Sequence, residues 1–233
     1  MGMHMKNCRF TDMKIMCIIL GVFFWGILVF CKLAGIEYIA KVIPEKLLLK
    51  YANLVVYGAF FILALIAFRK QFFSAVKDFK DNRQKYEKLI IVTIIITIVL
   101  MVASAIILSN MGVGDSNNEK SIEKSLENNG FMEIIVACFL GPVVEEVFYR
   151  GILFEFLNGK DKHLSRSIAA VILTSLFFAF MHVSLGNFTV TDMLANIPIL
   201  MLGLTVTTLY WKTENIICPI LVHIAMNTIA TMG

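Results

Sequence analysis

The stretch Gly-Pro-Val-Val-Glu-Glu-Val-Phe-Tyr-Arg, residues 141–150, places two adjacent carboxylates and an arginine inside an apolar run that extends from Phe131 to Leu157. A charged side chain at the centre of a membrane helix costs about 2.5–3.5 kcal/mol on insertion scales. Such residues face the interior of a helical bundle and by default indicate a functional site. We therefore expect their partners on other apolar segments of the chain.

The composition of the whole chain predicts a membrane protein. Of its 233 residues, 58% are hydrophobic and 16% are charged, and the mean hydropathy is +0.79. A soluble domain is usually about 45–50% apolar. We therefore predict an all-α polytopic membrane bundle and no nucleic-acid partner, because the basic residues that give the net charge of +4 flank apolar runs, where membrane orientation explains them.

Seven apolar runs have about the length that crosses a bilayer, which is roughly 20 residues for a helix. The first is expected to be an uncleaved span, with a signal peptide as the alternative. Fourteen Lys and Arg residues lie in the segments predicted to be inside and six in those predicted outside, which predicts a cytoplasmic N-terminus and an external C-terminus. The predicted spans are residues 15–33, 51–68, 89–108, 131–157, 167–182, 192–211 and 216–230.

Two polar segments help to define this topology. Arg69–Lys88 carries seven basic residues and is predicted to be a cytoplasmic loop, with a patch for anionic lipid as the alternative. Ser109–Gly130 is rich in Asn, Ser and Gly and is predicted to be an external loop.

Helical geometry assigns different roles to the two glutamates. Glu146 and Arg150 are four residues apart, so they share a helix face and can form an ion pair. Glu145 is rotated from Glu146 by about 100° and is freer to face a cavity. Glu145 is therefore the predicted reactive carboxylate, the alternative being ion pairs that only hold helices together. Pro142 removes a helical hydrogen bond just before the site and predicts a kink.

Two histidines lie in other apolar runs. His182 ends the fifth run, and His223 lies four residues before Asn227 in the last, so these two share a face. A carboxylate can activate water, and imidazole and amide groups can stabilise an oxyanion, which suffices to hydrolyse a peptide bond. Alternatively, Glu145, His182 and His223 could bind zinc and acidify its water.

The three polar patterns, in this order, resemble the motifs of the CPBP family, which contains CAAX prenyl endopeptidases and bacteriocin-processing or bacteriocin-immunity proteins. The patterns are Glu145-Glu146-x-x-x-Arg150, Phe178-x-x-x-His182 and His223-x-x-x-Asn227. The resemblance implies an intramembrane endopeptidase, often described as a metalloprotease, in which Glu145 and His182 activate water while His223 and Asn227 stabilise the oxyanion. It divides the chain into an N-terminal three-span membrane region, residues 1–130, and a catalytic membrane domain, residues 131–233.

The expected substrate is a membrane-associated peptide such as a CAAX-type, bacteriocin or pheromone peptide, and the expected location is a bacterial cell membrane, with lipids as further partners. Two other functions compete with proteolysis: non-catalytic bacteriocin immunity, and a transporter with a proton relay. The paired repeats that many transporters show are not evident in the sequence.

The predicted depths of Glu145 and His182 conflict with a single site formed by the three motifs. At 1.5 Å per residue, Glu145 lies about 21 Å from Phe131 along a straight helix. His182 instead lies near the outer end of its predicted span. The motifs can meet only if a helix tilts, starts later, or the site is off-centre.

Overall fold

The computed structural model describes residues 45–159, 163–183 and 189–232, and all regular structure in these ranges is helical. The prediction of an all-α protein is therefore confirmed. The first predicted span, residues 15–33, lies outside the described residues.

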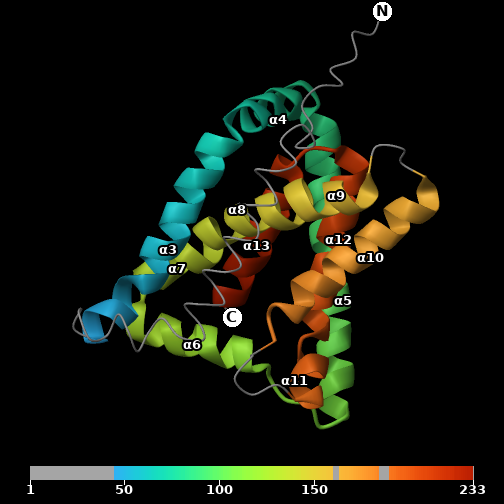
Figure 1. Cartoon of the computed structure of the whole chain (residues 1–233). Helices are drawn as coiled ribbons and strands as arrows, with labels where there is room; N and C mark the ends of the chain where they lie inside the picture. The colour runs from blue at the N-terminus through green and yellow to red at the C-terminus, as the bar shows by residue number, and fades with distance from the viewer. Residues whose placement is uncertain (1–44, 160–162, 184–188, 233) are drawn as a thin grey trace, which may run out of the picture.

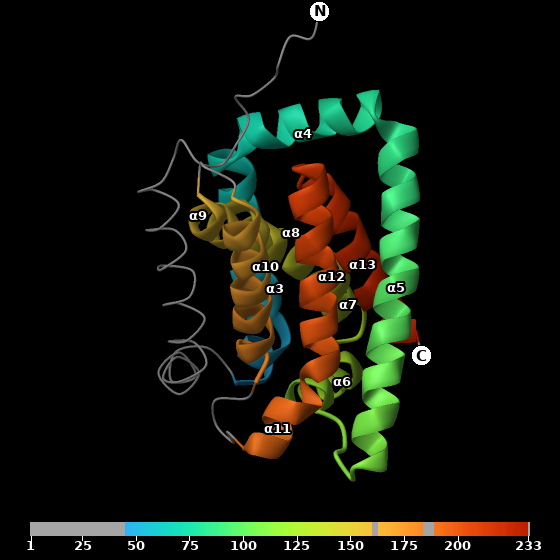
Figure 2. The ribbon, with the colours of Figure 1, turned by 90° about the vertical axis from the view of Figure 1, so that its right-hand side faces the viewer.

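The chain enters the described part through a bent helix pair. Helix α3 (Glu45–Ala67) is followed by α4 (Arg69–Asp81), which is turned by 79° at the buried residue Phe68. Helix α4 lies across one end of the bundle and leads into the long helix α5 (Arg83–Asn110), as Figure 2 shows.

Most of Arg69–Lys88 is thus helical, and the prediction of a loop there was wrong. The reason is a helical repeat of apolar residues, Phe72, Ala75 and Phe79, that packs against the bundle core while the basic residues stay exposed.

At the opposite end of the bundle, the predicted external loop contains helix α6 (Asn117–Asn129). The side chain of Ser116 caps this helix by accepting a hydrogen bond from the Glu119 backbone N–H at 3.1 Å. The backbone N–H of Asn117 donates to Asp192 at 2.8 Å, which ties α6 to the short helix α11 (Val190–Ala195). The polar composition of this segment therefore encodes a capped surface helix.

The run from Phe131 to Asn158, here called the central helix, crosses the bundle diagonally (Figure 1). It is helical throughout, but two π-helical segments interrupt its α-helical geometry. Pro142 is the second residue of α8, directly after the first π segment, so the helix type changes just before the site. The kink predicted at Pro142 stays a prediction. The five parts are α7 (Phe131–Ile135), η3 (Val136–Leu140), α8 (Gly141–Glu146), η4 (Val147–Phe154) and α9 (Glu155–Asn158).

Three further helices pack around the central helix: α10 (Leu164–Phe180), α12 (Ile197–Thr213) and α13 (Ile217–Met232). Helix α5 runs beside α12, and the hydroxyls of Thr97 and Thr205 lie 2.7 Å apart between them. The proposed division at residue 130 stays a prediction, since α5 packs along both α12 and α13.

The number of membrane spans is not confirmed. Within the described ranges, one helix, α5, is long and apolar enough to cross a membrane, or two if the bent pair α3–α4 forms one span. Helices α10 and α13 are apolar but shorter, at 17 and 16 residues. The central helix is divided by its π segments.

Candidate active site

The two glutamates stand at the end of α8, between the π segments η3 and η4. π-Helical insertions are rare and occur frequently at functional sites, because the extra residue in a turn redirects neighbouring side chains. The Glu146 side chain is fully buried, whereas that of Glu145 is 17% exposed. The predicted difference between the two carboxylates is therefore present in the structure.

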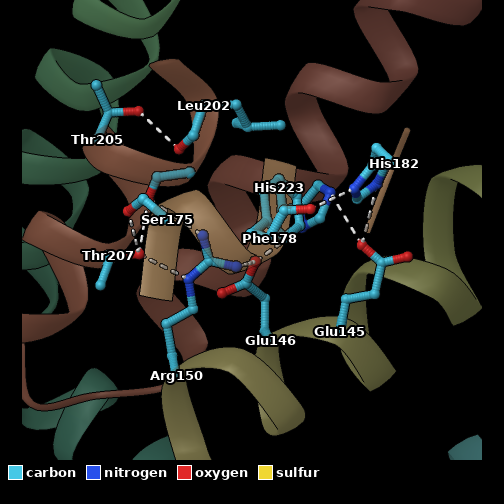
Figure 3. A network of polar contacts seen from close by, with 11 residues as sticks. Glu145, Glu146, Arg150, Ser175, Phe178, His182, Leu202, Thr205, Thr207 and His223 are labelled. Carbon is cyan, nitrogen blue, oxygen red and sulfur yellow. Dashed lines mark hydrogen bonds and ion pairs between the residues drawn. The ribbon is translucent and has the colours of Figure 1, made fainter. Parts of the chain in front are cut away.

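One carboxylate oxygen of Glu146 accepts hydrogen bonds from two side chains. Its Oε1 accepts from Arg150 Nη1 at 2.8 Å and from His223 Nδ1 at 2.7 Å (Figure 3). The ion pair with Arg150 that the spacing predicted is confirmed, and both of its side chains are fully buried. An ion pair removed from water in this way is stable only if further hydrogen bonds compensate its lost hydration.

Arg150 finds that compensation on α12 and α10. Its Nε donates to Thr207 Oγ1 at 3.2 Å and its Nη2 donates to the Gly203 carbonyl at 3.2 Å. The guanidinium also lies 4.9 Å from the centroid of the Phe178 ring. Sequence reasoning missed Thr207 and Gly203, although their spacing of four on an apolar helix is the small-residue pattern of close helix packing.

His223 connects Glu146 to Glu145. Because the Glu146 carboxylate is an acceptor, the Nδ1 atom of His223 must carry the proton. Its Nε2 atom then faces Glu145 Oε2 at 3.9 Å. A carboxylate that fixes the tautomer of a histidine is a common support for a reacting group.

The orientation of His182, in the turn after α10, is fixed in the same way. Its Nδ1 lies 2.8 Å from the Phe178 carbonyl, which can only accept, so Nδ1 is again the protonated nitrogen. The ring also lies against Phe178, with centroids 4.6 Å apart. His182 Nε2 is therefore directed at Glu145 Oε2, at 4.0 Å (Figure 3).

The structure thus brings together the three motifs that a straight-helix estimate kept apart. The diagonal path of the central helix carries Glu145 to the end of α10, where His182 follows in a turn. The site is off-centre along α10, as one of the three stated solutions required.

Asn227 is bonded to the backbone of the central helix, and its predicted role at the oxyanion stays a prediction. Its Nδ2 donates to the Ala137 carbonyl on η3 at 2.8 Å. This bond joins α13 to the central helix one turn away from His223. It engages one of the two amide hydrogens of Asn227.

The donor set Glu145, His182 and His223 is of the chemical type that zinc takes, but its spacing is wide. Two ligands of a tetrahedral zinc lie about 3.4 Å apart when each bond is about 2.1 Å. The two Nε2 atoms lie 3.9 and 4.0 Å from Glu145 Oε2. In the part of the chain that the structure describes, no group of three or more His, Cys, Asp or Glu residues is arranged to hold a metal ion. Zinc binding therefore stays a prediction, and no step below depends on it.

Comparison with known proteins agrees with this geometry. Residues 127–229 match the family described as "Type II CAAX prenyl endopeptidase Rce1-like". Over 118 residues the chain is 30% identical to a protein of Bacillus subtilis (strain 168) named "Putative membrane peptidase YdiL". The aligned part is 50% of this chain and 43% of that relative, so the chain spans less than half of the relative's length. No solved structure matches the chain significantly.

The family match covers all six motif residues, from Glu145 to Asn227, and supports a membrane protease at the level of the family. These residues occur in the order of the family's motifs and the matching relative is named a membrane peptidase, so residues 127–229 are similar to the CAAX prenyl endopeptidases, which is consistent with the resemblance to the CPBP family.

Proposed function

We propose that this protein is a glutamate-dependent intramembrane endopeptidase that hydrolyses a peptide bond in a membrane-associated substrate. The observation that carries the proposal is the convergence of two imidazole Nε2 atoms on one oxygen of Glu145. Separations of 3.9 and 4.0 Å exceed a direct hydrogen bond and suit a bridging water molecule.

In the proposed reaction, Glu145 takes a proton from this water as the water oxygen attacks the peptide carbonyl carbon. The carbonyl electrons move to its oxygen, and the tetrahedral intermediate collapses with cleavage of the C–N bond. The proton held by Glu145 then passes to the leaving nitrogen. His182 and His223 position the water, and Glu146 with Arg150 positions His223.

The substrate class follows from the family and not from any pocket in the structure. We propose a CAAX-type, bacteriocin or pheromone peptide that approaches from the lipid bilayer of a bacterial cell membrane. The N-terminus is proposed to be cytoplasmic, as the distribution of basic residues predicts.

The first prediction concerns Glu145. Glu145→Gln keeps the size of the side chain but removes the base, so cleavage should fall by about 10²-fold or more while the amount of folded protein stays the same. The assay measures cleavage of a fluorescence-quenched peptide with a prenylated CAAX end, and of the same peptide without the prenyl group, in detergent.

The same assay, repeated with a chelator, tests whether zinc is required. If zinc is required, a strong chelator should abolish cleavage and elemental analysis should show about one zinc per chain. A metal-free and fully active preparation would support the glutamate-only reaction. Wild-type cleavage by the Glu145→Gln protein would overturn the protease assignment, and retained protection against a bacteriocin without cleavage would indicate an immunity function.

A further inference from the structure

Helix α3 lies outside the region that matches the family, yet it follows the central helix closely. Asn53 donates to the buried Glu133 at 3.2 and 3.4 Å. Two turns later, the ring of Phe61 lies 5.7 Å from that of Phe139. Tyr57 stands between Asn53 and Phe61 at intervals of four, so it faces the central helix as they do.

Tyr57 and Glu145 both lie close to Gly141. A methyl group on Gly141 would lie 3.7 Å from Tyr57 Cε1 and 3.7 Å from Glu145 Oε1. The tyrosine ring and the carboxylate therefore flank one point on the central helix.

The reaction proposed above needs hydrogen-bond donors for the oxyanion, and some of the donors in the site are already engaged. His223 uses its Nδ1–H on Glu146, and Asn227 uses one amide hydrogen on the Ala137 carbonyl. That leaves one amide hydrogen of Asn227 for the oxyanion, whereas hydrolytic sites commonly supply two donors. A neutral phenol beside the general base can supply the second without adding charge to the site.

Resting on the function proposed above, we propose that Tyr57 is a further catalytic residue, which donates its phenolic hydrogen to the carbonyl oxygen of the scissile bond. The carbonyl oxygen would then approach Glu145 from the side of α3. The hydrogen stays on Tyr57 throughout: it strengthens its bond to the oxygen as negative charge develops there, and weakens it when the C–N bond breaks.

The alternative role for Tyr57 is packing, because a half-buried tyrosine commonly presents an apolar ring and a polar tip. The two roles depend on different atoms. Packing against Gly141 requires the ring, whereas donation requires the hydroxyl. The substitution that separates them is Tyr57→Phe.

The experiment measures kcat, KM and thermal unfolding in detergent for Tyr57→Phe, with Tyr51→Phe on the same helix as the matched control. Loss of one oxyanion donor should lower kcat by about 10²-fold or more. KM should change by less than about threefold, because the bond strengthens only in the transition state. The unfolding temperature should stay at the wild-type value, and the control should keep wild-type kcat.

A second variant, with 3-fluorotyrosine at position 57, keeps a hydroxyl of greater acidity and should retain at least wild-type kcat. A Tyr57→Phe protein with wild-type kcat would overturn the proposal, as would an equal loss in both Tyr57 variants. Neither outcome would affect the protease assignment so long as Glu145→Gln is inactive. An active Glu145→Gln protein would overturn both.

Discussion

At the scale of single residues, Glu145 and Glu146 show how adjacent identical side chains acquire different roles. The two side chains are rotated from each other by about 100° around the helix, and their surroundings differ. Glu146 is bonded to Arg150 and His223, whereas Glu145 lies 4.0 and 3.9 Å from the Nε2 atoms of His182 and His223. Glu146 is therefore expected to contribute mainly to stability and to the orientation of His223.

This difference predicts a stability loss for Glu146→Gln. The substitution leaves the buried Arg150 without its counter-charge, and breaking a buried pair in this way costs about 3–5 kcal/mol. Thermal unfolding in detergent should show a clearly lower midpoint, accompanied by reduced cleavage. The control is Glu87→Gln, which removes an Arg–Glu pair of the same i, i+4 spacing that is exposed to solvent, with Arg83 at 2.6 Å. That change should leave the midpoint nearly unaltered. Equal effects of the two substitutions would contradict the structural role of Glu146.

At the scale of helices, the close contact between α10 and α12 holds His182 in place. A methyl group on Gly203 would lie 3.2 Å from Phe178 Cδ1 and 3.3 Å from the Cα and Cβ of Ser175. Phe178 in turn holds His182 through its carbonyl and its ring. Gly203 thus permits the approach that sets the position of His182.

We therefore expect Gly203→Ala to destabilise the protein by about 1–3 kcal/mol, since the extra methyl group overpacks a buried contact. It should also reduce kcat, because a shift of Phe178 moves His182 relative to Glu145. Gly58→Ala on α3 is the matched control, as no atom of the described residues outside the backbone of its own helix lies within 4 Å of the added carbon. The control should be neutral or slightly stabilising, because alanine favours helix. Wild-type stability and activity in Gly203→Ala would show that the contact is not limiting.

At the scale of the whole molecule, the ends of the helices sort into two groups. Asn215, in the α12–α13 turn, donates to the Ala75 carbonyl and to Asp78 on α4, at 2.9 and 2.7 Å. At the other end, Asn117 at the start of α6 is bonded to Asp192 on α11. The segments predicted to be cytoplasmic, in α4 and the α12–α13 turn, therefore contact each other at one end of the bundle. The segments predicted to be external, in α6 and before α12, contact each other at the other end.

Reporter fusions test the resulting topology. Fusions in Arg69–Lys88 and in residues 158–166 should report a cytoplasmic location, and fusions in Ser109–Gly130 and at the C-terminus an external one. As controls, substitutions of Lys and Arg residues in the polar segments between the predicted spans would show how strongly these residues set the orientation. A cytoplasmic C-terminus would show that the number of spans differs from seven.

The sequence by itself determined the helical class of the protein, the ion pair of Glu146 with Arg150 and the shared face of His223 and Asn227. Each of these follows from local rules: the apolar composition of a segment and the angular spacing of residues along a helix. The three ordered motifs also indicated a resemblance to the CPBP family before any tertiary contact was known, and the match over residues 127–229 is consistent with it.

Only the tertiary structure decided which atoms face one another. Three features depend on contacts between residues far apart in the chain: the diagonal path of the central helix, the Asn227–Ala137 bond and the position of Tyr57 beside Gly141. Periodicity along one helix carries no information on the tilt of that helix or on which neighbour it meets, because these are fixed by side-chain packing across the bundle.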